Sequence, residues 1–153
     1  MAVNNADRGL DDQVRAQVYE DVMRSGSLPS ILEISARQAR AVEEVRASLQ
    51  RLTAGHILVL QKETGEILMA NPFSAVPTAF RVLAGQQVYF GNCIWDAMGI
   101  PAMLKQDAVI QASCSCCGTA MSLKVTGNSL EPAPGLAHFA VPAAHWWDNI
   151  VFT

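Results

Sequence analysis

Residues Tyr89–Ala102 read Tyr-Phe-Gly-Asn-Cys-Ile-Trp-Asp-Ala-Met-Gly-Ile-Pro-Ala. This stretch predicts the end of a strand, a glycine turn and a helix that carries Cys93 three residues before Asp96. Residues three apart on a helix share a face, with about 5 to 6 Å between Cβ atoms, so both side chains can reach one bound atom. We expect the helix dipole to favour the thiolate form of Cys93. The alternative is a packed core cysteine beside an aspartate that caps the helix.

The chain around this helix predicts a mixed α/β domain over residues 80–153. Its segments of apolar, β-branched and aromatic composition are Phe80–Leu83, Gln87–Phe90, Ala108–Ala112, Ala120–Val125 and, as a closing strand, Ile150–Phe152. Turns separate several of them, so we expect a mainly antiparallel sheet. The proline-rich segment Glu131–Pro142 is expected to cross the surface.

The chain before this domain predicts three helices and a β-hairpin, which is the order of a winged helix. The helical segments are Asp11–Ser25, Pro29–Ala36 and Arg40–Ala54, and the hairpin strands are His56–Leu60 and Glu66–Ala70. Asp11 or Asp12 is placed to favour the start of the first helix. We therefore predict an α+β fold with a winged-helix-like domain over 1–70 and a connector over 71–79.

A winged helix is either a packing domain or a DNA-binding domain whose third helix enters the major groove. The third helix carries Arg40, Arg46 and Arg51, but also Glu43 and Glu44, and the chain has a formal net charge of -3. Phosphate contacts dominate DNA affinity, and they are scarce here. We therefore expect no nucleic-acid partner.

The composition predicts a folded cytoplasmic protein without a cleaved signal. Half of the 153 residues are hydrophobic and 16% are charged, which excludes a disordered chain. The apolar runs are shorter than the roughly 18 residues that a membrane span needs, so we expect no membrane partner. Four cysteines are too few for a disulfide scaffold, which favours reduced thiols.

Cys114, Cys116 and Cys117 lie in the turn predicted between two strands. Cys114 and Cys117, followed by Gly118, have the Cys-x-x-Cys-Gly form of a zinc knuckle. A structural zinc ion needs two further ligands, for which the candidates are Cys93, Cys116, His138 and His145. None of these forms a second pair at ligand spacing. We favour thiols packed at a hairpin end, then soft-metal capture with transfer to Cys93, and zinc last.

Four features together resemble the organomercurial (alkylmercury) lyase family, over nearly the whole chain from about Asp11. They are the three helices with a hairpin, the connector Asn-Pro-Phe-Ser-Ala-Val-Pro-Thr at 71–78, the Cys93–Asp96 helix running into Gly-Ile-Pro-Ala at 99–102, and His-Trp-Trp-Asp at 145–148. The connector and the cysteine-aspartate helix are the most specific of the four. The features also occur in the family's order and at similar separations.

The resemblance implies an enzyme that cleaves a carbon–mercury bond by protonolysis and releases a hydrocarbon and Hg(II), as in mercury resistance. Cys93 would bind mercury, and Asp96 would accept the thiol proton and donate one to the carbon. Mercury is soft and prefers thiolate, and the leaving carbon needs a proton at close range. The resemblance implies no organic cofactor or catalytic metal. Cellular thiols or a mercuric reductase would take up the Hg(II).

The chain departs from the family pattern in its second active-site cysteine. Family members carry it on the strand that follows the tryptophan-rich segment, but residues 146–153 contain no cysteine. Because the sequence ends within an apparent strand, we expect a chain truncated before that cysteine, with a short divergent member as the alternative. A lone thiolate would lack the partner that weakens the carbon–mercury bond.

Two rival functions follow from the same residues. A non-catalytic protein would hold Hg(II), Cu(I) or Zn(II) with Cys93 and the Cys114–Cys117 turn, and a metal-responsive regulator would use the winged helix on DNA. Trp95, Trp146 and Trp147 are expected to pack in the core or shelter the site. His56 is expected to be a surface histidine or a core histidine with its hydrogen bonds satisfied.

Overall fold

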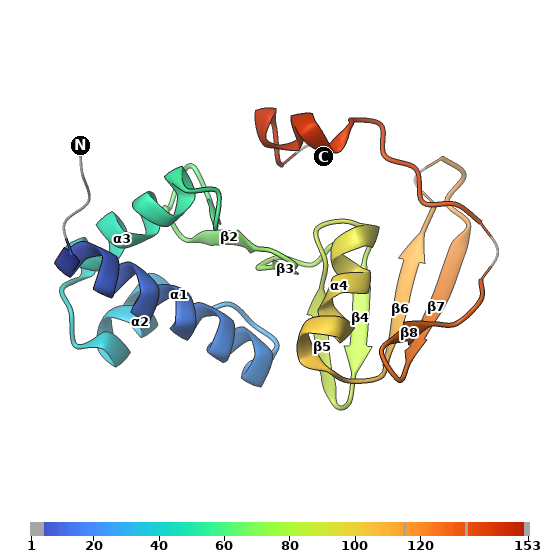
Figure 1. Cartoon of the computed structure of the whole chain (residues 1–153), viewed down its shortest axis with the longest axis horizontal. Helices are drawn as coiled ribbons and strands as arrows, with labels where there is room; N and C mark the ends of the chain where they lie inside the picture. Colours follow the sequence, from blue (N-terminus) through green and yellow to red (C-terminus); the bar gives the residue numbers. More distant parts are fainter. Residues whose placement is uncertain (1–4, 115, 134, 152–153) are drawn as a thin grey trace.

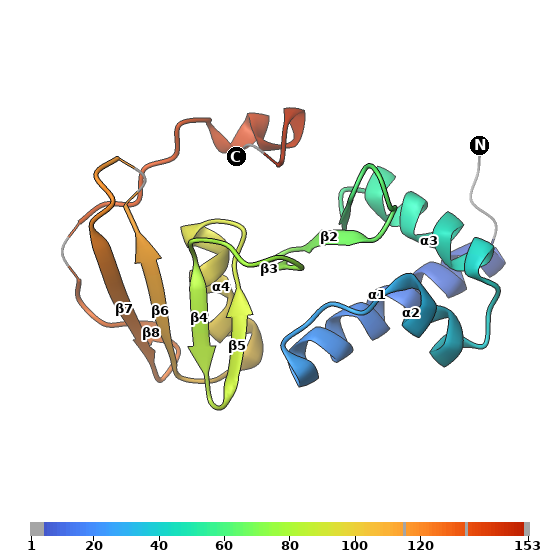
Figure 2. The same cartoon turned by 180° about the vertical axis from the view of Figure 1, so that it is seen from behind.

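The structure, a computed structural model, describes residues 5–114, 116–133 and 135–151. Three helices and a small sheet lie at one end of the molecule, and a larger sheet with one helix lies at the other (Figures 1 and 2). The strand pairs in both sheets are antiparallel. The predicted α+β class is therefore confirmed. None of the helices in the described ranges combines the length and apolarity that a bilayer crossing requires.

The predicted helices correspond to α1 (Asn5–Ser25), α2 (Ile31–Gln38) and α3 (Val42–Ala54). Ser30 caps α2 because its hydroxyl accepts a hydrogen bond from the Glu33 N–H while the Glu33 carboxylate accepts one from the Ser30 N–H.

The expectation that Asp11 or Asp12 marks the start of α1 was wrong, because α1 begins at Asn5. The Asp11 carboxylate instead accepts hydrogen bonds from Ser48 and Arg51 of α3. Asp11 therefore joins α1 to α3 and does not mark the start of α1.

The arginines of the third helical segment are all engaged within the protein. Arg51 donates to Asp11 at 2.7 Å, and Arg46 donates to the Thr64 carbonyl at 3.1 Å. Arg40 pairs with a glutamate one turn later at 3.5 Å. These contacts weigh against the interpretation that the helix reads DNA.

The first sheet contains the predicted hairpin and one strand from the connector. Its order is β1 (Val59–Leu60), β2 (Ile67–Ala70) and β3 (Phe73–Ser74). The strand β3 lies inside the segment predicted as a connector, and Phe73 forms an isolated bridge with Gly91. The connector therefore leads directly from one sheet toward the other.

The second sheet has the order β5-β4-β6-β7-β8. Four of its strands were predicted, and β8 was not; the strands are β4 (Arg81–Ala84), β5 (Gln87–Phe90), β6 (Ala108–Ser113), β7 (Ala120–Thr126) and β8 (Ser129–Leu130). The helix α4 (Ile94–Leu104) joins β5 to β6 and contacts β4 and β6.

The predicted closing strand at Ile150–Phe152 was wrong. A 3-10 helix, η1 (Ala143–Asp148), precedes a turn that contains Ile150 and Val151, and Phe152 lies outside the described residues. Apolar composition alone did not specify a strand because this segment has no strand partner among the described residues.

The buried side chains form two hydrophobic clusters, and α1 contributes to both. One cluster joins the three N-terminal helices to the first sheet. The other lies between α4 and the second sheet but also includes Val22 of α1 and Phe73 of β3. The Tyr89 hydroxyl also donates to the Met23 carbonyl at 2.9 Å. Thus α1 is packed against the second sheet as well as the first.

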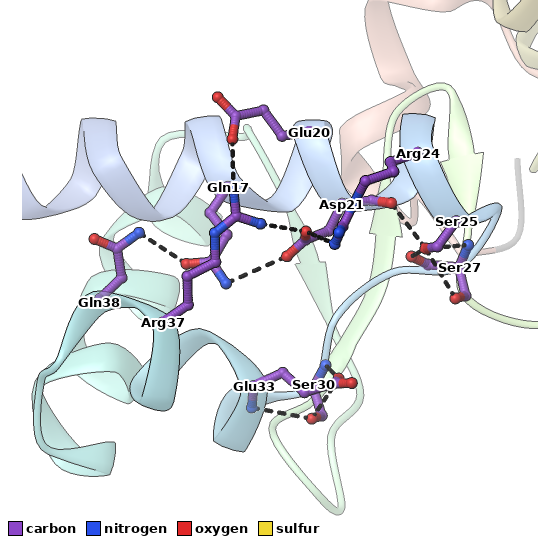
Figure 3. A network of polar contacts seen from close by, with 10 residues as sticks. All are labelled: Gln17, Glu20, Asp21, Arg24, Ser25, Ser27, Ser30, Glu33, Arg37 and Gln38. Carbon is purple, nitrogen blue, oxygen red and sulfur yellow. Dashed lines mark hydrogen bonds and ion pairs between the residues drawn. The ribbon is translucent and has the colours of Figure 1, made fainter.

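A polar network fastens α2 to the second half of α1 (Figure 3). The buried Asp21 carboxylate accepts hydrogen bonds from Arg24 at 2.6 Å, from Gln17 at 3.3 Å and from Arg37 of α2. Arg37 also pairs with Glu20 at 3.0 Å. The network fixes the half of α1 that reaches the second cluster.

Replacement of Phe73 tests the importance of this shared packing. The Phe73 side chain is 1% exposed, so Phe73→Ala should lower the free energy of unfolding by about 3 to 5 kcal/mol in urea denaturation followed by circular dichroism. Val76→Ala, in the same connector but 42% exposed, should change it by less than about 0.5 kcal/mol. Equal effects of the two variants would contradict the packing described here.

Candidate active site

Cys93 and Asp96 lie at the start of α4, as the spacing predicted. Cys93 has an extended backbone conformation at the N-cap, and Asp96 is in the first turn. The approach to this turn is very tight: a Cβ on Gly91 would lie 2.6 Å from the backbone nitrogen of Ala97. Only glycine fits there without movement of the backbone. Gly91 therefore allows the chain after β5 to lie against the first turn of α4, with Cys93 at the start of that helix.

The two side chains interact directly. The Asp96 carboxylate raises the pKa of the Cys93 thiol and the thiol lowers the pKa of Asp96, while the backbone N–H groups of Asp96 and Trp95 lower the pKa of Cys93. Asp96 Oδ2 also accepts a hydrogen bond from the Asn92 side-chain amide at 2.9 Å. The thiol and the carboxylate therefore influence each other's protonation.

The expected thiolate at Cys93 was wrong for the resting protein. Burial raises the pKa of the Cys93 thiol, and the negative charge of Asp96 raises it further, against the opposing effect of the backbone N–H groups. Burial also raises the pKa of Asp96, although hydrogen bonds from Asn92 and Cys93 oppose that rise. The helix-start effect is real but smaller than the cost of burying charge.

Sequence reasoning missed Asn92 and Asn71. The Asn92 amide donates to Asn71 Oδ1 at 3.1 Å as well as to Asp96, and the Asn71 carbonyl accepts a hydrogen bond from the Tyr19 hydroxyl at 3.0 Å. The four-residue spacing of Asn92 and Asp96 was an available signal. Asn71 had none, because its approach to Asn92 depends on the tertiary fold.

A pocket of about 200 Å³ opens in front of the pair. Its walls come from β2, the connector, α4 and the C-terminal segment, and the lining residues are Met69, Asn71, Asn92, Cys93, Trp95, Asp96, Trp146, Trp147 and Ile150. Cys93 also lines an adjoining pocket of about 330 Å³, together with apolar side chains that include Phe80 and Phe139. The thiol therefore faces a largely apolar space.

The tryptophans lie around the pocket rather than in the core. Trp95 is 62% exposed and lines the pocket with Trp146 and Trp147, which fits the second of the two expected roles, shelter of the site, rather than core packing. Trp147 stacks on His56, with ring centroids 4.3 Å apart and planes 7° from parallel. This stack, which the sequence did not predict, joins η1 to the turn before β1.

The other cysteines lie in the turn between β6 and β7. Cys114 is half-buried, whereas Cys116 and Cys117 are exposed, so packed thiols were the wrong expectation for these two. Hydrogen bonds with Thr119 and with the Cys114 side chain lower the pKa of Cys117. Within 5–114, 116–133 and 135–151, the structure forms no group of three or more His, Cys, Asp or Glu side chains that could hold a metal ion. It therefore does not bring Cys93, His138 or His145 to this turn as a ligand set.

Comparisons with known proteins give a family match and a shared fold. A family model described as alkylmercury lyase matches residues 73–153, which is more than half of the chain. A solved structure titled as the mercury-bound form of MerB2 shares the fold, with a TM-score of 0.62 and 17% sequence identity. The match covers 80% of this chain and 58% of that one, so the present chain spans less than two thirds of its length. The comparison with curated proteins found no match.

The raised pKa of Asp96 determines how the stability of the fold should change with pH. An acid whose pKa is higher in the folded state destabilises the fold once it is ionised, so stability falls as the pH rises through the window that begins at the ordinary value of 3.8. Asp96→Asn keeps the shape without the charge and should melt at a higher temperature than the wild type at pH 7. The difference should vanish at acid pH, where Asp96 is protonated in both states.

Thermal melts followed by circular dichroism across this pH range measure the difference. Asp12→Asn, at an exposed position on α1, is the matched control and should show no such gain. A variant that is less stable than the wild type at pH 7 would contradict the assigned direction of the Asp96 pKa.

Proposed function

The chain belongs to the alkylmercury lyase family, and from that premise we propose that it cleaves the carbon–mercury bond of organomercurials by protonolysis. The observation that carries the proposal is the placement of Cys93 and Asp96 together at the start of α4, in the wall of a largely apolar pocket. Protonolysis needs a soft sulfur ligand and a proton donor within reach of the same substrate. The pair supplies both.

In the first step, the Cys93 sulfur forms a bond to the mercury of an organomercury cation or its thiol adduct. The previous ligand leaves with its electron pair, and the thiol proton moves to Asp96. Asp96 lies in the first turn of the helix that Cys93 caps and interacts with its thiol, so it is placed to accept this proton. The raised pKa of Asp96 suits it to accept and hold the proton. The thiolate thus forms when mercury replaces the proton.

In the second step, Asp96 donates this proton to the carbon bound to mercury. The electron pair of the carbon–mercury bond becomes the new carbon–hydrogen bond, the hydrocarbon leaves, and Hg(II) stays on Cys93. The Asp96 carboxylate, now ionised, lies beside the ion that it has helped to form. Burial strengthens this attraction because the surroundings have a low dielectric constant.

Only one cysteine, Cys93, is found among the described residues that line the pocket. We propose that a small thiol from solution takes the position of the second family cysteine and then carries Hg(II) away, either as a free complex or to a mercuric reductase. The pocket walls of tryptophan, methionine and isoleucine suit substrates with apolar organic groups. No organic cofactor or resident metal enters this scheme.

The organisation of the chain completes the proposal. We propose a winged-helix-type domain over 1–70, a connector over 71–79 and a catalytic domain over 80–153, in a protein that acts in the cytoplasm. The helix and strand order and the two hydrophobic clusters support this division. The contribution of α1 to the second cluster indicates that the domains would act as one body.

Hydrocarbon release tests the proposed activity. Purified protein incubated with phenylmercury and excess monothiol should release benzene, measured by gas chromatography, and Cys93→Ala should reduce release to the uncatalysed level. Asp96→Asn should lower the rate by about 10² to 10⁴-fold because proton transfer is lost while the sulfur remains. Cys116→Ser, at an exposed cysteine outside the pocket, is the control and should retain the rate. Benzene release no higher than that of Cys93→Ala would refute the activity.

Asn92 should control the protonation of Asp96. Its side-chain hydrogen bond lowers the pKa of Asp96, so Asn92→Leu should raise that pKa further and move the acid limb of the kcat/KM profile to higher pH. We expect kcat/KM to fall roughly tenfold, as for loss of one hydrogen bond to a charged group. A loss of rate with an unchanged pH profile would show that Asn92 only supports the fold.

A further inference from the structure

The turn between β6 and β7 holds two thiols that the lyase scheme does not use. The Cys114 N–H donates to the Thr119 carbonyl at 2.9 Å, and the Gly118 N–H donates to the Cys114 carbonyl at 2.8 Å. These two bonds close the turn from both sides. Gly118 has a positive φ of 71°, which is the backbone conformation that glycine adopts without strain.

The closed turn brings Cys114 and Cys117 together. The Gly118 N–H to Cys114 carbonyl bond spans the pair, the Cys114 side chain is near enough to lower the pKa of Cys117, and the Cys117 sulfur lies 3.1 Å from the Thr119 hydroxyl oxygen. Cys117 is exposed and Cys114 is half-buried, so solutes can reach the pair. Cys116 is exposed as well, and no hydrogen bond joins it to the pair within the described part of the turn.

The number of ligands restricts the metals that suit this pair. A structural zinc ion needs four ligands. No group of three or more His, Cys, Asp or Glu side chains in the described ranges is placed to hold a metal ion. A soft cation that is satisfied by two thiolates needs nothing more than Cys114 and Cys117.

The fold puts this pair at the same end of the sheet as Cys93. Both β5 and β6 are antiparallel to β4, which lies between them, so β5 and β6 run in the same direction. Cys93 follows the end of β5, and Cys114 follows the end of β6. Two strand spacings, about 10 Å, separate those strand ends across the sheet. Figures 1 and 2 show the start of α4 and the β6–β7 turn at this common end.

We propose that Cys114 and Cys117 form a second, two-coordinate site for a soft cation, namely Hg(II), separate from Cys93. Two sulfur–mercury bonds form as the two bonds to the previous thiolate ligands break, and those ligands take up the two protons that Cys114 and Cys117 release. Once one cysteine has bound, the other acts at a high effective concentration, so the pair displaces monothiols. That the pair accepts Hg(II) from Cys93 rests on the proposed function. That the pair binds Hg(II) does not depend on it.

Mercury retention by the Cys93→Ala variant of residues 1–153 tests the second site. The reduced protein is mixed with one equivalent of Hg(II) in a large excess of N-acetylcysteine, desalted and measured for mercury by elemental mass spectrometry. We expect close to one equivalent to remain bound, with native mass spectrometry showing one mercury gained and two protons lost. Adding Cys114→Ser or Cys117→Ser to Cys93→Ala should reduce retention at least tenfold.

Cys116→Ser in the same Cys93→Ala background is the matched control and should retain the ion. Circular dichroism of each variant verifies that it is folded. No retained mercury in Cys93→Ala, or equal loss with Cys116→Ser and Cys117→Ser, would overturn the proposed pair. If Cys93→Ala retains mercury while the wild-type protein releases no benzene, the second site stands and the lyase proposal is refuted, so the two failures are distinguishable.

Discussion

The close approach of Gly91 to Ala97 is the constraint on which the site depends. With no space for a Cβ, the backbone leaves β5 and enters α4 with only Asn92 and Cys93 between the glycine and the helix. That short passage puts Cys93 at the N-cap, Asp96 one turn later and Asn92 between them and the connector. The helix start fixes the spacing of Cys93 and Asp96, and the short passage before it fixes where this pair lies relative to β5 and the connector.

Two physical effects compete at Cys93, and their outcome sets the chemistry. The backbone N–H groups at the start of α4 favour the thiolate, but burial and the negative charge of Asp96 favour the thiol. The raised pKa of Cys93 favours the thiol, and in the proposed reaction its proton is the one that passes to the carbon. A fully ionised cysteine would bind mercury readily but would deliver no proton to the carbon. In the proposed reaction, burial of Cys93 is therefore useful because it favours the protonated thiol.

Local patterns in the sequence predicted most of the elements but few of the contacts between them. Helical spacing located α2 and α3, and apolar runs located β4 to β7, because these segments follow their own periodicity. The position of Cys93 and Asp96 on one helix turn followed for the same reason. Asp11 and Asn71 were missed or misassigned because their partners are distant in sequence, and burial of Cys93 could not be weighed without the pocket. The segment Ile150–Phe152 was apolar without a neighbouring strand to pair with.

The contact between Tyr19 and Asn71 has a consequence for how the chain can be divided. The Tyr19 hydroxyl of α1 donates a hydrogen bond to the Asn71 carbonyl. The Asn92 side-chain amide donates to the Asn71 side chain and to the Asp96 carboxylate, so these bonds connect α1 with Asp96. Met69 and Asn71 are pocket walls, yet both precede residue 73, where the family match begins. The N-terminal part of the chain therefore supplies one wall of the pocket and, through Tyr19, supports it. A fragment that begins at residue 73 would keep Cys93 and Asp96 but lose that wall.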